Sequence, residues 1–196
     1  MHSPYIVAIG GTTRPFSSTE KALRIALDAA EAAGAETALI AGQDIMLPLY
    51  MPEHPDRSAA AQHMLREIAR ADGLLVGSPG YHGSLSGLVK NALDYVEDLA
   101  RDQRPYFSGR AVGCITTAAG HQGAVATLGA LRSIVHALRG WPTPLGAAIN
   151  TLESPFDACG GCTDPRATQV LQSIGTEIVE FARRWRCANT LTTNAA

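Results

Sequence analysis

The sequence of 196 residues has no long apolar run and no cluster of basic residues. A membrane-spanning helix needs about 20 consecutive apolar residues, so we expect no contact with a membrane. A net charge of −2 without a lysine- or arginine-rich segment argues against nucleic acid as a main partner. The first expected strand begins at Tyr5 and leaves no room for a cleavable signal, so we expect a cytoplasmic protein.

Cysteines are few, and their pattern does not indicate a disulfide framework in a chain of this size and expected compartment. Cys159 and Cys162 flank two glycines, a spacing that can bind metal or form a redox pair. No second ligand pair accompanies them, and they lie beyond the last expected strand. A thioredoxin-like pair would instead lie where a strand meets a helix. We expect a loop that carries two thiols, and no metal site.

Two phosphate-binding motifs are also missing. The chain has no G-x-x-x-x-G-K-[ST] segment, which argues against a nucleoside triphosphatase. Its first turn has no G-x-G-x-x-G, so the usual dinucleotide fingerprint is absent. A mononucleotide fits the sequence better than either ligand.

Strand and helix patterns alternate along the chain, which predicts an α/β fold with a parallel sheet and right-handed crossovers. A length of 196 residues suits one domain, which we place at residues 1–185, with a disordered tail at 186–196. The expected strands are 5–9, 36–41, 74–76, 110–117 and 144–150. The expected helices are 17–34, 58–71, 85–99, 125–138 and 164–185.

The first strand is followed by a loop rich in hydroxyl groups. Residues 11–16 contain Thr12, Thr13 and Arg14, and the next helix opens with Ser17, Ser18 and Thr19. Free amides at a helix start, hydroxyl groups and a guanidinium together suit a phosphate monoester. The alternative is helix capping alone, since Ser17 and Glu20 have the spacing of a capping box. The number of hydroxyl groups favours anion binding.

The third strand, at residues 74–76, meets a second loop, and we expect the strand to end at Gly77. The candidate binding residues here are Pro79, Gly80, Tyr81, His82, Gly83 and Ser84. Glycines allow close approach of a ligand to the backbone, and two flat rings suit a planar ligand. A tight connection with an incidental exposed tyrosine explains the segment equally well, so the other loops must decide.

A third loop follows the fourth strand and is small and glycine-rich. Its candidate residues are Thr117, Gly120, His121 and Gln122, which could lie against a ring system and donate hydrogen bonds. His121 is ambiguous because no partner carboxylate is visible in the sequence. Residues 44–57 form another loop, rich in proline, that we expect to be structured and packed on the domain. The alternatives are a cover for the cofactor edge or a subunit contact.

The loops carry patterns similar to those of the NAD(P)H-dependent FMN reductase family of flavodoxin-like proteins. Gly11, Thr12, Arg14, Ser17 and Thr19 resemble its first pattern, G-S-x-R-x-x-S-x-[NT]. The second, P-x-Y-x-G-S-x-x-G-x-x-K-N-A-x-D, is matched by Pro79, Tyr81, Gly83, Ser84, Gly87, Lys90, Asn91, Ala92 and Asp94. Gly80 and His82 stand where many relatives have glutamate and asparagine, which could alter the contacts to the flavin and the preferred acceptor. The resemblance spans about residues 5–185.

This resemblance implies a flavodoxin-like three-layer sandwich with a five-stranded parallel sheet in the order 2-1-3-4-5. It implies that Arg14 and the hydroxyls of Thr12, Ser17, Ser18 and Thr19 hold the FMN phosphate. Residues 79–84 and 117–122 would then frame the isoalloxazine ring. Hydride passes from NADPH or NADH to the flavin, so no catalytic side chain is implied.

The implied function is an NAD(P)H:FMN oxidoreductase that reduces free flavin or a small-molecule acceptor, with a separate monooxygenase as one possible partner. The family also implies a homodimer or homotetramer, with the 85–99 helix at an interface. A quinone or azo reductase of the same fold is one alternative. A non-enzymatic flavodoxin-like electron carrier is another, although carriers of this type tend to be strongly acidic and this chain is nearly neutral.

Overall fold

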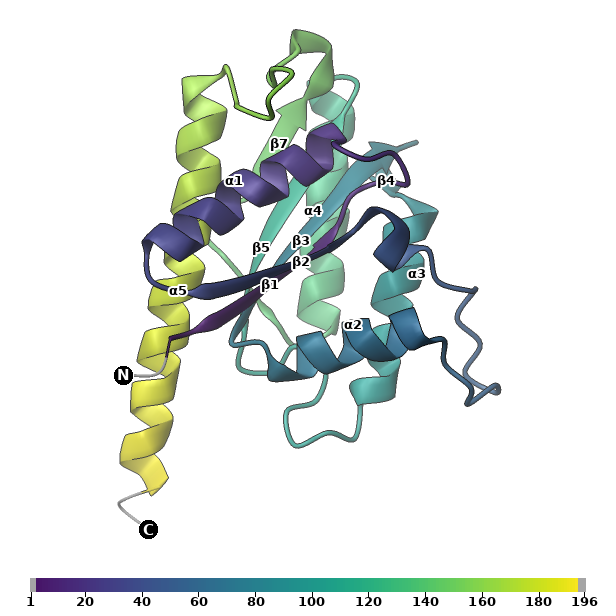
Figure 1. Cartoon of the computed structure of the whole chain (residues 1–196), viewed down its shortest axis with the longest axis vertical. Helices are drawn as coiled ribbons and strands as arrows, with labels where there is room; N and C mark the ends of the chain where they lie inside the picture. The colour runs from purple at the N-terminus through teal and green to yellow at the C-terminus, as the bar shows by residue number, and fades with distance from the viewer. Residues whose placement is uncertain (1–2, 194–196) are drawn as a thin grey trace.

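A parallel sheet lies at the centre of the computed structural model, which describes residues 3–193, and helices cover both of its faces (Figure 1). The strands are β1 (Tyr5–Gly10), β2 (Glu36–Ala41), β3 (Gly73–Tyr81), β4 (Ser84–Leu85), β5 (Ala111–Ala118), β6 (Trp141–Pro142) and β7 (Ala147–Asn150). The helices are α1 (Ser18–Ala32), α2 (Ala59–Arg70), α3 (Gly87–Asp94), α4 (His121–Ala137) and α5 (Pro165–Thr193). Short 3₁₀ segments are η1 (Gly42–Ile45), η2 (Tyr95–Leu99) and η3 (Thr151–Glu153).

The strand order β2-β1-β3-β5-β6 confirms the predicted flavodoxin-like order. The predicted fifth strand is divided in two, because β6 pairs with the start of β5 and β7 pairs with its end. Pro142 and Pro144 lie at the break, and neither has an N–H group to donate to a sheet ladder. The divided strand therefore occupies a single edge position in the sheet.

Alternation along the strands separates two hydrophobic cores. Ile6 and Ala8 of β1 pack in one core with α1 and α5, whereas Val7 and Ile9 pack in the other with α2, α3 and α4. Both faces of β1 are fully buried, as expected for a central parallel strand. Gly175 of α5 lets this helix approach α1 closely, since a Cβ there would lie 2.1 Å from the carbonyl oxygen of Ala26. The three-layer prediction is confirmed.

β3 is longer than predicted. It continues through Gly77 to Tyr81 and then folds back antiparallel into β4. The strand continues because β5 still pairs with it as far as Pro79. His82 and Gly83 form the turn with φ of 51° and 83°, and positive φ at both central residues is typical of a type I′ hairpin. The predicted 85–99 helix consequently starts later, at Gly87, and ends as the 3₁₀ segment η2.

The closing helix also exceeds its prediction. Residues 186–193, predicted as part of a disordered tail, continue α5 to Thr193, while residues 194–196 lie outside the described part of the chain. Arg186 anchors this extension through a bidentate ion pair with Asp72, with Nε to Oδ1 at 2.9 Å. That partner is 114 residues away in the sequence, so local composition could not reveal it. The single-domain assignment of residues 1–185 stays a prediction.

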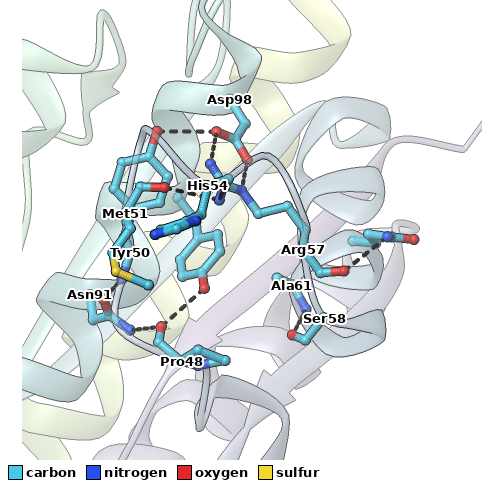
Figure 2. Close-up of polar contacts among 11 residues, drawn as sticks. Pro48, Tyr50, Met51, His54, Arg57, Ser58, Ala61, Asn91 and Asp98 are labelled. Carbon is cyan, nitrogen blue, oxygen red and sulfur yellow. Dashed lines mark hydrogen bonds and ion pairs between the residues drawn. The ribbon is translucent and has the colours of Figure 1, made fainter.

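The loop at residues 44–57 packs against α3 and η2, as predicted (Figure 2). The Arg57 guanidinium donates to both oxygens of Asp98 at 2.6 and 2.9 Å and lies over the Tyr50 ring at 4.8 Å. Asn91 accepts a hydrogen bond from the Tyr50 backbone N–H and donates to the Pro48 carbonyl. Charged and amide side chains therefore hold this loop against α3 and η2.

Within residues 3–193, no helix combines the length and the apolar character needed to cross a membrane. The cytoplasmic location stays a prediction.

Candidate functional site

A cleft of about 420 Å³ opens at the carboxyl ends of β1, β3 and β5. In open α/β sheets this edge is where ligands bind. Its lining residues come from four segments, two of which include the ends of β3 and β5: Thr12, Arg14, Ser17, Ser18 and Thr19; Pro79, Gly80 and Tyr81; Thr117, Ala118 and Ala119; and Thr151. Nine of the fifteen predicted site residues line this cleft, and the structure brings them together from three separate segments.

The first loop turns tightly from β1 into α1. Gly10 has φ of 142°, and a Cβ there would lie 1.9 Å from the Gly77 carbonyl oxygen, so no other residue fits. The Gly11 N–H donates to that carbonyl, and the Arg14 N–H donates to Thr12 Oγ1 at 3.1 Å. These contacts direct the loop across the end of β3 and place its hydroxyl groups at the cleft.

The start of α1 is capped as the sequence predicts. Ser17 Oγ accepts from the Glu20 N–H at 3.3 Å, while a Glu20 carboxylate oxygen accepts from the Phe16 N–H at 3.0 Å. Glu20 is buried, and its other oxygen pairs with Arg24 at 2.7 Å. The negative charge near the helix start is thus balanced by a guanidinium, which leaves the positive end of the helix dipole available to an anion.

Capping leaves donors that the fold does not use. Within residues 3–193, neither the Arg14 guanidinium nor the Ser18 hydroxyl has a hydrogen-bond or ion-pair partner, and both line the cleft. Arg14 is exposed to solvent. A helix start, a hydroxyl and an unpaired guanidinium form the donor set expected for a phosphate monoester. This arrangement fits the phosphate end of FMN.

Thr19 has a role inside the fold. Its hydroxyl lies 2.7 Å from that of Thr117, and both side chains are buried. The bond joins the start of α1 to the end of β5, so it fixes the first loop against the third. The assignment of Thr19 to the phosphate stays a prediction, and the structure adds this tie between two loops.

The second predicted loop, which the structure shows to be the end of β3, borders the cleft with residues that include a glycine. At Gly80 a Cβ would lie 2.4 Å from the Thr127 hydroxyl, so the strand end packs directly on α4. Ser78 Oγ accepts from the Ser86 N–H at 3.1 Å and holds the base of the hairpin. Tyr81 is 56% exposed at the cleft. His82, Gly83 and Ser84 form the hairpin turn and its far side, beyond the lining of the cleft.

Three of the four residues predicted in the third loop lie outside the lining of the cleft. Gly120, His121 and Gln122 do not line the cleft, whereas Ala118 and Ala119 do. His121 Nε2 lies 2.9 Å from a carboxylate oxygen of Glu153, which corrects the view that no carboxylate partner accompanies it. Both residues line a neighbouring hollow of about 330 Å³ beside β7. Glu153 follows the fifth strand, 32 residues away, so sequence proximity could not show the pair.

Three lining residues were not among the predicted site residues: Ala118, Ala119 and Thr151, of which Thr151 lies outside all three predicted loops. Thr151 comes directly after β7 and begins η3. The preceding Asn150 accepts the Gly120 N–H at 2.8 Å and so joins the fifth strand to the third loop. The rule that found the other loops, a polar residue after a strand, would also have found Thr151.

The second sequence pattern serves two separate purposes. Pro79 and Tyr81 line the cleft, but Asn91 holds the 44–57 loop and Lys90 pairs with Asp94 at 2.5 Å on the surface of α3. Beside Asn91, the Arg57 guanidinium holds the pKa of Asp98 below its usual range, whereas burial and the Asp98 hydrogen bond raise the pKa of Tyr50. Part of the pattern therefore specifies loop structure and not ligand contact.

The cysteines are all free within residues 3–193. Cys114 is buried in β5, and burial raises the pKa of its thiol to about 12. Cys159 is exposed and Cys162 is half-buried in the loop before α5. In the same described part of the chain, no group of three or more His, Cys, Asp and Glu residues is arranged to hold a metal ion.

Comparison with known proteins gives a match to the family model described as NADPH-dependent FMN reductase over residues 4–152. An NADPH azoreductase of Bacillus sp. (strain OY1-2) is 29% identical over 129 residues, which are 65% of this chain and 66% of that protein. An NAD(P)H-dependent FMN reductase of Pseudomonas aeruginosa is 28% identical over 128 residues, 65% and 68% of the two chains. The matched stretch thus spans about two thirds of these curated relatives.

Among solved structures, FerB from Paracoccus denitrificans, described as a flavoenzyme NAD(P)H:(acceptor) oxidoreductase, is similar with a TM-score of 0.73. Its sequence is 21% identical, and the match covers 92% of this chain and 98% of FerB. At this identity the likeness supports the flavodoxin-like fold.

Proposed function

The chain belongs to the NADPH-dependent FMN reductase family, and we propose that it transfers hydride from NADPH or NADH to FMN and passes the electrons to a small-molecule acceptor. The observation that carries this proposal is the cleft at the strand ends, with an unpaired guanidinium and hydroxyl beside the start of α1. That donor set fits one phosphate group. The sequence also lacks the motifs that are typical of triphosphate and dinucleotide sites.

The proposed cofactor site consists of the nine predicted residues that line the cleft. Arg14, Ser18 and the first amides of α1 would hold the phosphate. The backbone of Pro79 and Gly80 and the segment from Thr117 to Ala119 would lie beside the isoalloxazine ring. His82, Gly83, Ser84, Gly120, His121 and Gln122 would support this frame from outside the lining.

The protein's part in the reaction is to position two ring systems. A bound flavin would supply the hydride acceptor and the one- or two-electron chemistry, and the residues of the cleft would hold it. The fixed loops, tied together through Thr19 and Thr117 and through Gly120 and Asn150, would keep the flavin in one orientation. Tyr81 at the exposed mouth would limit the approach of the nicotinamide and the acceptor. None of these residues needs to act as an acid or a base.

The acceptor is the open part of the proposal. Free flavin, a quinone or an azo compound would each fit an exposed cleft, and one of the similar proteins is named an azoreductase. We propose that the acceptor is one of these three, and that with free FMN as acceptor the reduced FMN would pass to a separate monooxygenase. Steady-state oxidation of NADPH by FMN-loaded protein, with free FMN, a quinone or an azo dye added, ranks the three. If free FMN adds nothing while the dye or quinone does, the supply of reduced flavin is the wrong description.

The electron carrier is the second candidate. Carriers of this type tend to be strongly acidic, whereas this chain has a net charge of −2, which favours the enzyme. Rapid mixing with NADPH separates the two functions. Bound flavin that stays oxidised with NADPH, yet accepts electrons from a reductase protein, would identify a carrier.

We also propose a homodimer or homotetramer. The 44–57 loop is held rigidly by Arg57 and Asn91, yet it exposes Met46, Leu49 and Met51 by 49%, 75% and 40%. Exposed apolar side chains on a fixed loop are typical of a subunit contact. Light scattering should give a mass above 20.6 kDa, and Leu49→Asp should lower it. A monomer for the unchanged protein would refute the assembly.

A further inference from the structure

A second cavity, of about 490 Å³, lies at the opposite end of the sheet from the cleft. Asp72 lines it and directly precedes β3, and Gly109 lines it just before β5, whereas the cleft lies at the carboxyl ends of these strands. The two sites are separated by the length of β5, which is roughly 25 Å at 3.3 Å per residue. The C-terminal half of α5, in the yellow part of Figure 1, forms one wall of the second cavity.

Positive charge exceeds negative charge in this lining. Three guanidinium groups, of Arg70, Arg104 and Arg186, face a single carboxylate, Asp72. That carboxylate is already used, because it pairs with Arg186 in a bidentate contact and accepts the Tyr5 N–H at 2.8 Å. Arg70 pairs with Glu67 at 3.0 Å, and Glu67 does not line the cavity.

Arg104 is the guanidinium without a carboxylate. Within residues 3–193 its hydrogen bond is a single one to the Ala71 carbonyl at 3.2 Å, although the side chain is half-buried. Burial lowers the pKa of Arg104, and the charge of Arg186 lowers it further, although Asp72 opposes this. An arginine has five N–H donors, so most of those of Arg104 are available to a ligand.

A further arginine, Arg110, adds positive charge close to Arg104. Arg110 is completely buried and bonds to carbonyl oxygens of Ala69, Ala71 and Tyr106. Burial lowers its pKa to about 10, with a further contribution from Arg104. Buried or half-buried like charges repel each other in a medium of low dielectric constant, and an anion bound at Arg104 would offset part of that repulsion.

The wall that α5 forms also carries an aromatic ring. The Trp185 indole lines the cavity, is 37% exposed and stacks on Phe181 with ring centroids 5.6 Å apart. Gly109 has φ of 72°, and a Cβ there would lie 2.8 Å from Trp185 Nε1, so glycine is what allows the indole to sit against this loop. Volumes of 300–1,000 Å³ are usual for small-molecule sites, which this cavity satisfies.

We propose that this cavity binds a planar aromatic anion, with the anionic group on Arg104 and the ring against Trp185. A nucleoside monophosphate and an aromatic carboxylate share this chemistry, and the experiment below separates them. The site is independent of the proposed flavin chemistry, since it lies at the other end of the sheet and shares no residue with the cleft.

The test is a titration of the full chain, loaded with equimolar FMN and no excess, by AMP, salicylate, adenosine and inorganic phosphate. Tryptophan fluorescence reports on the site because Trp185 lines it and Trp141 lies 6.5 Å from Trp185. Calorimetry gives the affinity independently. We expect AMP or salicylate, whichever class is bound, to bind saturably and to change the fluorescence, and adenosine to do neither.

Arg104→Met should weaken that binding at least ~10-fold, in keeping with loss of a hydrogen bond to a charged group. The matched control Arg101→Met, which removes an exposed charge three residues away, should leave it unchanged. Arg104→Lys keeps the charge and should give an intermediate affinity, so it tests the site even if the methionine variant does not fold. The proposal is overturned if neither AMP nor salicylate saturates by about 10 mM, if Arg104→Met and Arg101→Met behave alike, or if phosphate alone binds as tightly as both aromatic anions.

Discussion

Arg14→Ala should weaken FMN binding and leave riboflavin binding almost unchanged. Arg14 lines the cleft beside the start of α1, and within residues 3–193 its guanidinium has no protein partner to lose. The fold should therefore change in stability by less than about 0.5 kcal/mol. A hydrogen bond to a charged group contributes about 1.5–3 kcal/mol, which corresponds to a 10- to 150-fold weaker FMN complex. Riboflavin has no phosphate, so the same change removes nothing from it.

The assay is quenching of flavin fluorescence, measured for FMN and riboflavin at low and high ionic strength. Lys21→Ala is the matched control, because Lys21 carries the same charge on α1 but bonds to the Asp157 carbonyl and does not line the cleft. The Arg14 effect should shrink as salt increases, since an exposed charge is screened. An equal loss for both flavins, or an equal effect of the control, would refute the assignment of Arg14 to the phosphate.

Three further changes test the fold around the site. Asp98→Asn should lower the free energy of unfolding by about 1–3 kcal/mol, because Arg57 loses a charged partner that is 25% exposed. Arg57 lowers the pKa of Asp98 in the folded protein, so this stabilisation should be fully present above the unfolded pKa of about 3.9. It should disappear as the pH falls through the folded pKa. The free energy of unfolding of the variant should therefore depend less on pH in the acid range. Phe16→Gly should stabilise the protein by about 0.5–1 kcal/mol in urea unfolding, since Phe16 is 71% exposed with φ of 53°; a loss would show that the ring is needed. Gly175→Ala should cost about 1–3 kcal/mol, measured the same way, because its Cβ would meet the Ala26 carbonyl oxygen; an unchanged midpoint would mean that α5 can shift.

The strands were predictable because each is a short run of apolar residues that ends in a loop, whereas their order in the sheet was implied by the resemblance to the family. The carboxyl ends of parallel strands meet at one edge, so residues as distant as Arg14, Pro79 and Thr117 could be grouped before their contacts were known. The capping box at Ser17 was predictable for a similar reason, since its partners lie within four residues. Local periodicity and local chemistry were sufficient for these features.

What the sequence could not show depends on partners far along the chain. The helical extension at Arg186 depends on Asp72, and the contact of His121 depends on Glu153. The course of β3 past Gly77 depends on pairing with β5, which overrides the local preference for a turn. The second cavity is another case, because its arginines come from three segments that only the fold brings together.

The central claim is that this chain binds FMN in the cleft and reduces it with a nicotinamide nucleotide. The most direct measurement is anaerobic rapid mixing of FMN-loaded protein with NADPH, and separately with NADH, followed by the visible absorbance of the bound flavin. We predict loss of the oxidised flavin band at a rate that saturates with nucleotide, and weaker FMN loading in Arg14→Ala. Failure of the protein to bind FMN, or bound FMN that neither nucleotide reduces, would contradict it.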